Sequence, residues 1–283
     1  MDRSLRELRV GRASVAGEPA SGDSVVRYPA GAPAFRRRLE DFESVLATMS
    51  SLRLSFRAVA LVSVTGAETS RCSAVAWSEC QVPGVDSMHK IEIRRDPETL
   101  LFSDSRFPDA TSFVYYFDIV CPADHGVTIS AAHAAIDVWG VRGRIEIRSA
   151  HGRVSLRENL GDAEVTTSEG GHVDWSGRQG NIRLISQLGI DLNLTGGTFE
   201  GKLEANTQRS IHVVMPAEFE SGIEVSVAAA DRFKPSPGAV SRFRRHEHSG
   251  RVLWICGTGQ PALRLTSADG TVFVEEGSSP GPV

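Results

Sequence analysis

Four consecutive units of about 20 residues repeat between residues 143 and 216, and this repeat constrains the fold more than any other feature of the chain. The units begin at Gly143, Gly161, Gly180 and Gly201, at spacings of 18, 19 and 21 residues. Each unit reads as a short alternating segment, a Ser or Thr, a turn that usually contains Gly, and a second alternating segment. Strand-built repeats of this period are typical of a β-solenoid, in which each repeat forms one coil that stacks on the next.

The apolar residues of the repeats fall on one side of each predicted strand. Successive side chains of a strand point to opposite faces, so apolar residues two positions apart share a face. The first strands carry the pairs Ile145/Ile147, Ala163/Val165, Ile182/Leu184 and Leu203/Ala205, and the second strands carry Val154/Leu156, Val173/Trp175, Leu192/Leu194 and Ile211/Val213. Because stacked coils lie about 4.8 Å apart, we expect continuous apolar columns inside the stack and polar columns outside it.

The turns keep the same register. The turn begins with Ser149, Thr167, Ser186 or Thr207, and in the first three units Gly152, Gly170 or Gly189 follows three residues later. A column of hydroxyls at a corner can bond the backbone of neighbouring coils. Segments 127–138 and 263–274 fit the same frame, which extends the predicted all-β solenoid to about six short coils.

The rest of the chain divides into tails and a cap. Residues 1–33 and 277–283 are predicted to be disordered tails, because they are polar or rich in Gly, Ser and Pro and lack periodicity. Residues 34–120 are predicted to form a β-rich N-terminal cap region, with a short amphipathic helix over 34–50 or, alternatively, a strand that starts near Phe35. The solenoid is placed at 121–276, with a long loop at 228–250 where Pro, Gly and charged residues break the period.

Composition and charge narrow the classes of partner and site. The net charge of −4 gives no electrostatic case for binding nucleic acid. No apolar run of about 18 residues occurs, so no membrane span is predicted. The N-terminus also lacks an apolar signal core, so a cytoplasmic location is expected.

Phosphate-loop, nucleophile-elbow and HExxH patterns are missing, so no cofactor is expected. The cysteines Cys72, Cys80, Cys121 and Cys256 are predicted to be buried thiols, with a Cys72–Cys80 disulfide as the alternative.

Several segments resemble a known family. FDIVCPADHGVTIS resembles the junction, and RIEIRSAHGRVSL, DAEVTTSEGG and LRLTSADGTVFVEE resemble the repeated core, of a bacterial domain family of unknown function labelled "putative adhesin". Cys121–Pro122 stands where that family usually has Val-Pro, and the resemblance covers residues 52–276. It implies a right-handed single-stranded β-solenoid. By its label it also implies an interaction role at the cell envelope or surface, which is the alternative location. The family offers no catalytic residues to carry over.

The polar side chains of the second strands are the best candidate for a binding face. The residues predicted to form this face, for a protein or glycan partner, are Asp137, Trp139, Ser155, Asp174, Asn193 and His212. Asp137, Asp174 and Asp191 could form the acidic cluster of a glycoside-cleaving enzyme. Asp137 and Asp174 are compatible with its paired carboxyls, about 5–9.5 Å apart, with Trp139 stacking on a sugar ring. Because any soluble solenoid exposes acids, a non-enzymatic scaffold or adhesin-like interaction protein is the preferred prediction. A carbohydrate-active β-helix enzyme is the alternative.

Two further features lead to weaker hypotheses. His133 and His151 occupy equivalent corner positions one coil apart and Glu169 follows in the next coil, so the three could share a metal ion. A solvated column of corner residues is the simpler interpretation, and no metal is expected. The two ends of a coil stack expose unpaired backbone groups, so a filament that assembles through the solenoid ends is a third functional hypothesis.

Overall fold

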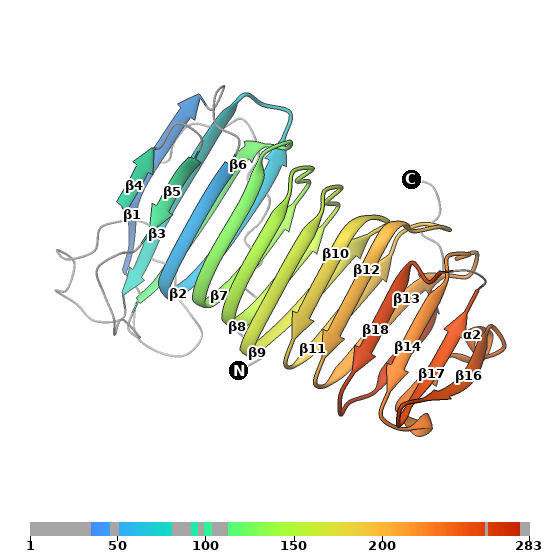
Figure 1. Cartoon of the computed structure of the whole chain (residues 1–283). Helices are drawn as coiled ribbons and strands as arrows, with labels where there is room; N and C mark the ends of the chain where they lie inside the picture. Colours follow the sequence, from blue (N-terminus) through green and yellow to red (C-terminus); the bar gives the residue numbers. More distant parts are fainter. Residues whose placement is uncertain are drawn as a thin grey trace.

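The computed structural model describes residues 35–45, 51–80, 92–95, 99–103, 113–257 and 260–277. This described chain is all-β, as expected: its strands belong to one mixed 19-stranded sheet. Helical residues within it are limited to a 3-10 turn and one turn of α-helix. Figure 1 shows the strands side by side along one tilted stack. The tails predicted at 1–33 and 277–283 lie outside the described residues, except for Gly277, which ends the last strand.

The elements follow one another closely along the chain. The N-terminal strands are β1 (Phe35–Val45), β2 (Ser51–Ala67), β3 (Arg71–Cys80), β4 (Glu92–Arg95), β5 (Thr99–Ser103) and β6 (Phe113–Pro122). The central strands are β7 (Gly126–Trp139), β8 (Ile145–Arg157), β9 (Ala163–Gly177), β10 (Gln179–Ser186), β11 (Gly189–Leu194), β12 (Glu200–Thr207) and β13 (Ser210–Pro216). The C-terminal elements are β14 (Ile223–Val227), η1 (Ala230–Arg232), β15 (Phe233–Pro235), α2 (Pro237–Val240), β16 (Phe243–His248), β17 (Arg251–Cys256), β18 (Leu263–Ser267) and β19 (Val272–Gly277).

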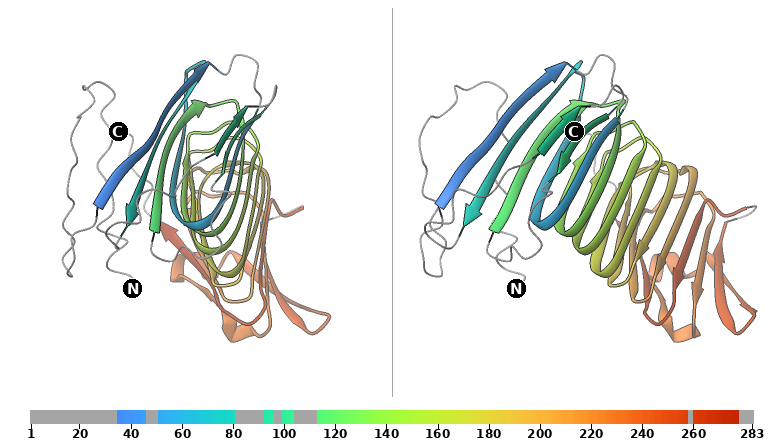
Figure 2. Two further views of the ribbon diagram at one scale, coloured as in Figure 1. Left: turned by 90° about the vertical axis from the view of Figure 1, so that its left-hand side faces the viewer. Right: turned by 60° about the vertical axis from the view of Figure 1, so that its left-hand side comes forward.

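The repeats lie side by side in parallel register. We call each repeat a rung: a first strand, a corner and a second strand, where a long strand such as β8 bends through the corner. Parallel pairing joins the rungs formed by β2, β7, β8, β9, β10–β11, β12–β13, β18–β19 and β14–β15. Figure 2 shows these rungs as nested turns of the ribbon that overlie one another along the stack.

The apolar columns expected from the repeat form the core. Ile129, Ile147 and Val165 are successive register partners and are buried. The other inner columns are Val127–Ile145–Ala163–Ile182–Leu203–Leu263, Ile136–Val154–Val173–Ile190–Ile211–Val272 and Val138–Leu156–Trp175–Leu192–Val213–Val274, and all of these side chains are buried. Removing such columns from water is the main source of stability for a stacked fold.

Buried polar side chains at two of the corner positions, Ser186 and Asn159, form hydrogen bonds with neighbouring rungs. The corner hydroxyls Ser149, Thr167, Ser186, Thr207 and Ser267 are all buried. Ser186 Oγ donates to the Gly171 carbonyl at 2.7 Å and accepts from the Gly189 N–H at 3.2 Å. At the opposite corner Asn159 accepts from the Val141 N–H at 2.8 Å and donates to the Val138 carbonyl at 3.0 Å. These bonds satisfy backbone groups that would otherwise be buried without partners.

The glycines that open each repeat mark a close approach between rungs. A Cβ at Gly161 would lie 2.2 Å from the Gly143 carbonyl oxygen, and a Cβ at Gly201 would lie 2.4 Å from the Gly180 oxygen. Gly180 and Gly201 also have positive φ, of 110° and 119°. The roughly 20-residue spacing of glycine therefore marks a corner where the backbones of neighbouring rungs leave no room for a side chain.

The rungs do not stack in sequence order at either end. β2 lies between β6 and β7, and the β18–β19 rung lies between β12–β13 and β14–β15. The rung series therefore extends into the predicted cap region, and the last coil of the sequence is inserted inside the stack. The antiparallel hairpin β16–β17 continues the sheet beyond β14.

Two predictions of local structure were wrong. Residues 35–45 form strand β1, the alternative that starts at Phe35, and not the helix expected within 34–50, because this segment pairs antiparallel with β3 along its whole length. A register shift between Arg38 and Glu40 disturbs the two-residue alternation, and this hides the strand signal in the sequence. The loop expected at 228–250 contains β15, α2 and β16, which are held in part by the buried contact between Phe233 and Phe243, whose ring centroids lie 4.9 Å apart.

Candidate functional site

The outward side chains of the second strands form one surface across successive rungs. We call it the second-strand face, and its residues are Asp137, Trp139, Arg153, Ser155, Arg157, His172, Asp174, Asp191, Asn193 and His212. Asp137, Ser155 and Asp174 are register partners on β7, β8 and β9, at the positions that the repeat predicts. Trp139 ends β7 and leaves 46% of its surface exposed to solvent.

Asn193 does not continue this column. The register partner of Asp174 on β11 is Asp191, and Asp191 in turn pairs with His212 on β13, while Asn193 lies opposite Ser176. Corner lengths explain the error: the chain is two residues shorter between Ser186 and Ile190 than between the equivalent residues of β9. The motif of apolar, polar and apolar residues in 173–175, 190–192 and 211–213 carried the correct alignment.

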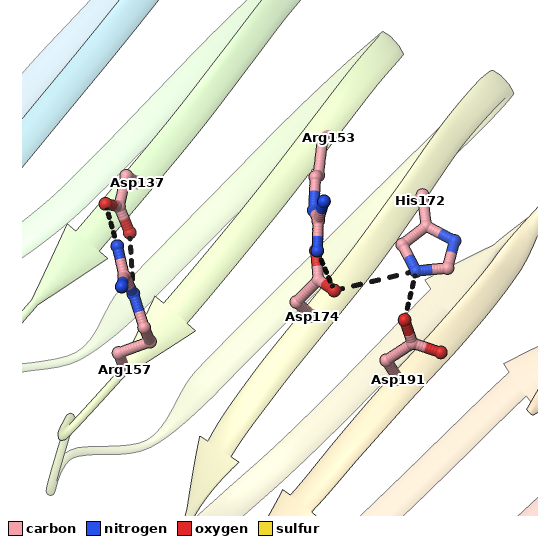
Figure 3. Close-up of polar contacts among 6 residues, drawn as sticks. All are labelled: Asp137, Arg153, Arg157, His172, Asp174 and Asp191. Atoms are coloured by element: carbon pink, nitrogen blue, oxygen red, sulfur yellow. Dashed lines mark hydrogen bonds and ion pairs between the residues drawn. The ribbon is translucent and has the colours of Figure 1, made fainter. Parts of the chain in front are cut away.

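Arginines from neighbouring positions hold the two carboxylates that were considered for catalysis. The guanidinium of Arg157 donates to both oxygens of Asp137, with Nε at 3.3 Å from Oδ1. The guanidinium of Arg153 donates to both oxygens of Asp174, with Nη2 at 2.6 Å from Oδ1. Each pair joins adjacent rungs diagonally across the sheet, as Figure 3 shows. Bidentate pairing of this kind fixes the orientation of both side chains.

A histidine and a second aspartate extend the Arg153–Asp174 pair. His172 Nε2 lies 3.0 Å from Asp191 Oδ2 and 3.7 Å from Asp174 Oδ1 (Figure 3). The hydrogen bond with Asp191 raises the pKa of His172, although partial burial opposes that shift. The same bond lowers the pKa of Asp191. The geometry therefore favours an imidazolium between two carboxylates when no other cation is bound.

His172 was missed at the sequence level. One donor atom from each of His172, Asp174 and Asp191 falls within 4.8 Å of the others, and among the described residues no other set of three His, Cys, Asp or Glu meets this criterion. Its neighbour Asp191 was displaced from the predicted column by the misplaced Asn193. The sequence could have shown this cluster. The correct alignment of 173–175 with 190–192 makes Asp174 and Asp191 neighbours and places His172 two residues before Asp174 on the same strand face.

The three residues considered for a metal ion at the other corner do not converge. His133 and His151 are register partners whose rings stack with centroids 4.6 Å apart and planes only 1° from parallel. A ring nitrogen donates its lone pair in the plane of the ring, so two parallel stacked rings do not direct lone pairs at one ion. His151 Nε2 instead lies 3.0 Å from Glu169 Oε2. This arrangement fits a solvated polar contact at a corner.

The cysteines with described side chains are free and buried. Cys72, Cys121 and Cys256 form no disulfide, which contradicts the alternative of a Cys72–Cys80 bond. Burial raises the pKa of both the Cys72 and Cys121 thiols to about 12. A thiol with so high a pKa supplies almost no thiolate near neutral pH, so burial makes both residues poor nucleophiles.

Comparison with known proteins adds little to this geometry. No protein-family model and no curated protein matches the chain. A solved structure from Clostridium sporogenes ATCC 15579, described as a "putative cell adhesion protein", is similar over 85% of this chain and 100% of its own, with 9% identity and a TM-score of 0.34. Similarity at that level carries no argument about this chain. Within the described residues, no helix is both long and apolar enough to cross a membrane.

Proposed function

We propose that this chain is a non-enzymatic, right-handed β-solenoid scaffold of adhesin-like character, whose second-strand face binds a protein or glycan partner. Parallel, in-register pairing from β2 to the β14–β15 rung supports the solenoid. Such pairing holds outward side chains in regular columns about 4.8 Å apart. A rigid surface of this kind loses little conformational entropy when it binds.

Trp139 is the observation that carries the proposal. It is a large aromatic side chain that stays 46% exposed although it belongs to a strand. Its register partner is Arg157, whose guanidinium is fixed by Asp137. Trp and Arg are the residues most often found at the energetic centres of interfaces, and a Trp ring can stack on a sugar.

The ion pairs favour binding over glycoside cleavage. A glycosidase needs one carboxyl to protonate the leaving group and a second to act as base or nucleophile. Both oxygens of Asp137 and both oxygens of Asp174 already accept hydrogen bonds from an arginine. Their arrangement supports a structural and presenting role for the two carboxylates.

The C-terminal edge of the sheet argues against the filament hypothesis. β16 pairs only with β17 in the described chain, and five of its six side chains are exposed. These five are Arg244, Arg245, His246, Glu247 and His248. Charged side chains along an edge strand discourage pairing with a second molecule.

A glycan array combined with a sugar-release assay tests the proposal. We expect saturable binding of one glycan class, weakened about 30-fold by Trp139→Ala, since an aromatic hot spot contributes about 2 kcal/mol. Leu188→Ala is the matched control, because Leu188 is 44% exposed but lies at a corner outside the second-strand face. Binding that Trp139→Ala leaves intact would refute the assignment of the face. Turnover that is abolished by Asp137→Asn would instead establish the enzyme.

A further inference from the structure

The cluster of His172, Asp174 and Asp191 has the donor set and spacing of a transition-metal site. We propose that these three side chains bind one zinc ion on the second-strand face, with solvent at the fourth position. The zinc site lies on the face proposed to bind a partner, but its test can fail separately, because it uses neither Trp139 nor Arg157.

The distances between the donor atoms suit tetrahedral zinc. With bonds of about 2.0–2.1 Å to nitrogen and oxygen, donor atoms around zinc lie about 3.3 Å apart. His172 Nε2 lies 3.0 Å from Asp191 Oδ2 and 3.7 Å from Asp174 Oδ1, which brackets this value. All three donor atoms fall within 4.8 Å of one another, so a small rotation of the half-exposed Asp191 side chain completes the set.

The surrounding residues orient these ligands. A Cβ at Gly189, the register partner of His172, would lie 3.2 Å from His172 Nδ1, so the glycine leaves room for the imidazole to lie over β11. Arg153 holds the carboxylate of Asp174 through two N–H groups. Hydrogen bonds to a ligating carboxylate are the usual second layer of a metal site. The positive charge of Arg153 lowers the affinity of the site for zinc, because it repels the metal ion.

The site is open to solvent. The side chains of His172 and Asp191 are 33% and 46% exposed, so an ion can enter without any opening of the rungs. Zinc sites with three protein ligands and one exchangeable position are the open type. Hard cations such as magnesium prefer an all-oxygen shell, so the imidazole selects for zinc over magnesium.

Calorimetric titration of the metal-free full-length chain with zinc chloride tests this proposal. We expect one equivalent of zinc per chain, and His172→Gln or Asp191→Asn to weaken binding at least about 100-fold. Zinc at 100 times the wild-type dissociation constant should raise Tm by roughly 5–10 °C in the wild type and by no more than about 2 °C in either variant. Circular dichroism of each variant checks that it is folded.

A matched control separates this site from surface histidines elsewhere. His246 and His248 alternate on the exposed strand β16, and the double variant H246Q/H248Q should retain the full equivalent of zinc. Cobalt(II) bound to the wild type should show the intense visible bands of four-coordinate geometry. Zinc uptake that persists in His172→Gln, uptake lost in H246Q/H248Q, or no saturable uptake at about 1 mM zinc would each overturn the proposal.

Discussion

Gly161→Ala should destabilise the chain although it adds a single methyl group. The new Cβ would lie 2.2 Å from the Gly143 carbonyl oxygen and 2.4 Å from the Arg142 carbonyl oxygen. An ordinary contact needs about 3.4 Å, so two backbones stacked about 4.8 Å apart must separate locally by about 1 Å. Overpacking costs about 1–3 kcal/mol, and a collision with two carbonyl oxygens of the neighbouring backbone falls at the upper end. We therefore expect a loss of about 3 kcal/mol.

Thermal unfolding followed by circular dichroism measures this loss. For a chain of this size about 3 kcal/mol corresponds to a decrease in Tm of roughly 6–12 °C. Gly196→Ala is the control, because the nearest atom to its Cβ would lie 3.5 Å away, in ordinary contact. That variant should match the wild type or exceed its stability by about 0.5 kcal/mol, through the less flexible unfolded chain. Equal Tm values for the two variants would refute the close approach of the rungs.

Three further predictions concern buried polar groups and thiols. Burial raises the pKa of Asp118 above its ordinary 3.8, although the hydrogen bond from Ser63 opposes this shift. The contribution of Asp118 to the free energy of unfolding therefore falls as the pH rises through the raised pKa. Asp118→Asn should therefore be more stable than the wild type at pH 7, with the difference lost below pH 3.8 in urea titrations. Cys72 and Cys121, with pKa values of about 12, should resist iodoacetamide at pH 8 until the chain is unfolded, as peptide mass mapping can detect. Asn159→Leu should lower the free energy of unfolding by about 2–3 kcal/mol in thermal unfolding, since it leaves two backbone groups of the preceding rung without partners. A reactive native thiol or an unchanged melt would contradict the burial of these groups.

The apolar interior was predictable because each inner position repeats the same chemistry. In every unit the apolar residues, such as Ile147 and Val165, alternate with polar neighbours. Strand geometry alone then assigns the apolar residues to one face. The corner hydroxyls and the opening glycines were predictable for the same reason. Each of these residues acts at its own corner, so its regular spacing along the sequence is enough to predict its place.

The stacking order was not predictable from the repeat. Leu203 and Ala205 on β12 pair with Leu263 and Leu265 on β18, and β14 offers Ile223 and Val225 to the other side of β18. All three rungs present the same alternation of apolar residues, so no local pattern states which two are neighbours. The order depends on how the chain between them folds, including the hairpin β16–β17.

The candidate site was predicted in part. Asp137, Ser155 and Asp174 fell in one column because the corners of their rungs are similar. Asn193 was misplaced because the next corner is shorter, and a displacement of two residues keeps the alternation intact while it changes the neighbour. The alternation of apolar residues therefore does not reveal a two-residue shift between rungs, and such a shift changes which outer side chains are neighbours.

The distance between spin labels at Ser130 and Thr266 tests the stacked, interleaved arrangement most directly. Register partners link the two positions through Arg148, Thr166, Ile185 and Asn206. Five strand spacings then place their Cα atoms about 24 Å apart although 136 residues separate them in sequence. Pulsed electron paramagnetic resonance on a chain carrying both labels and Cys80→Ser should give a narrow distribution centred near this value. A broad distribution, or one centred above about 29 Å as sequence-ordered stacking requires, would contradict the arrangement.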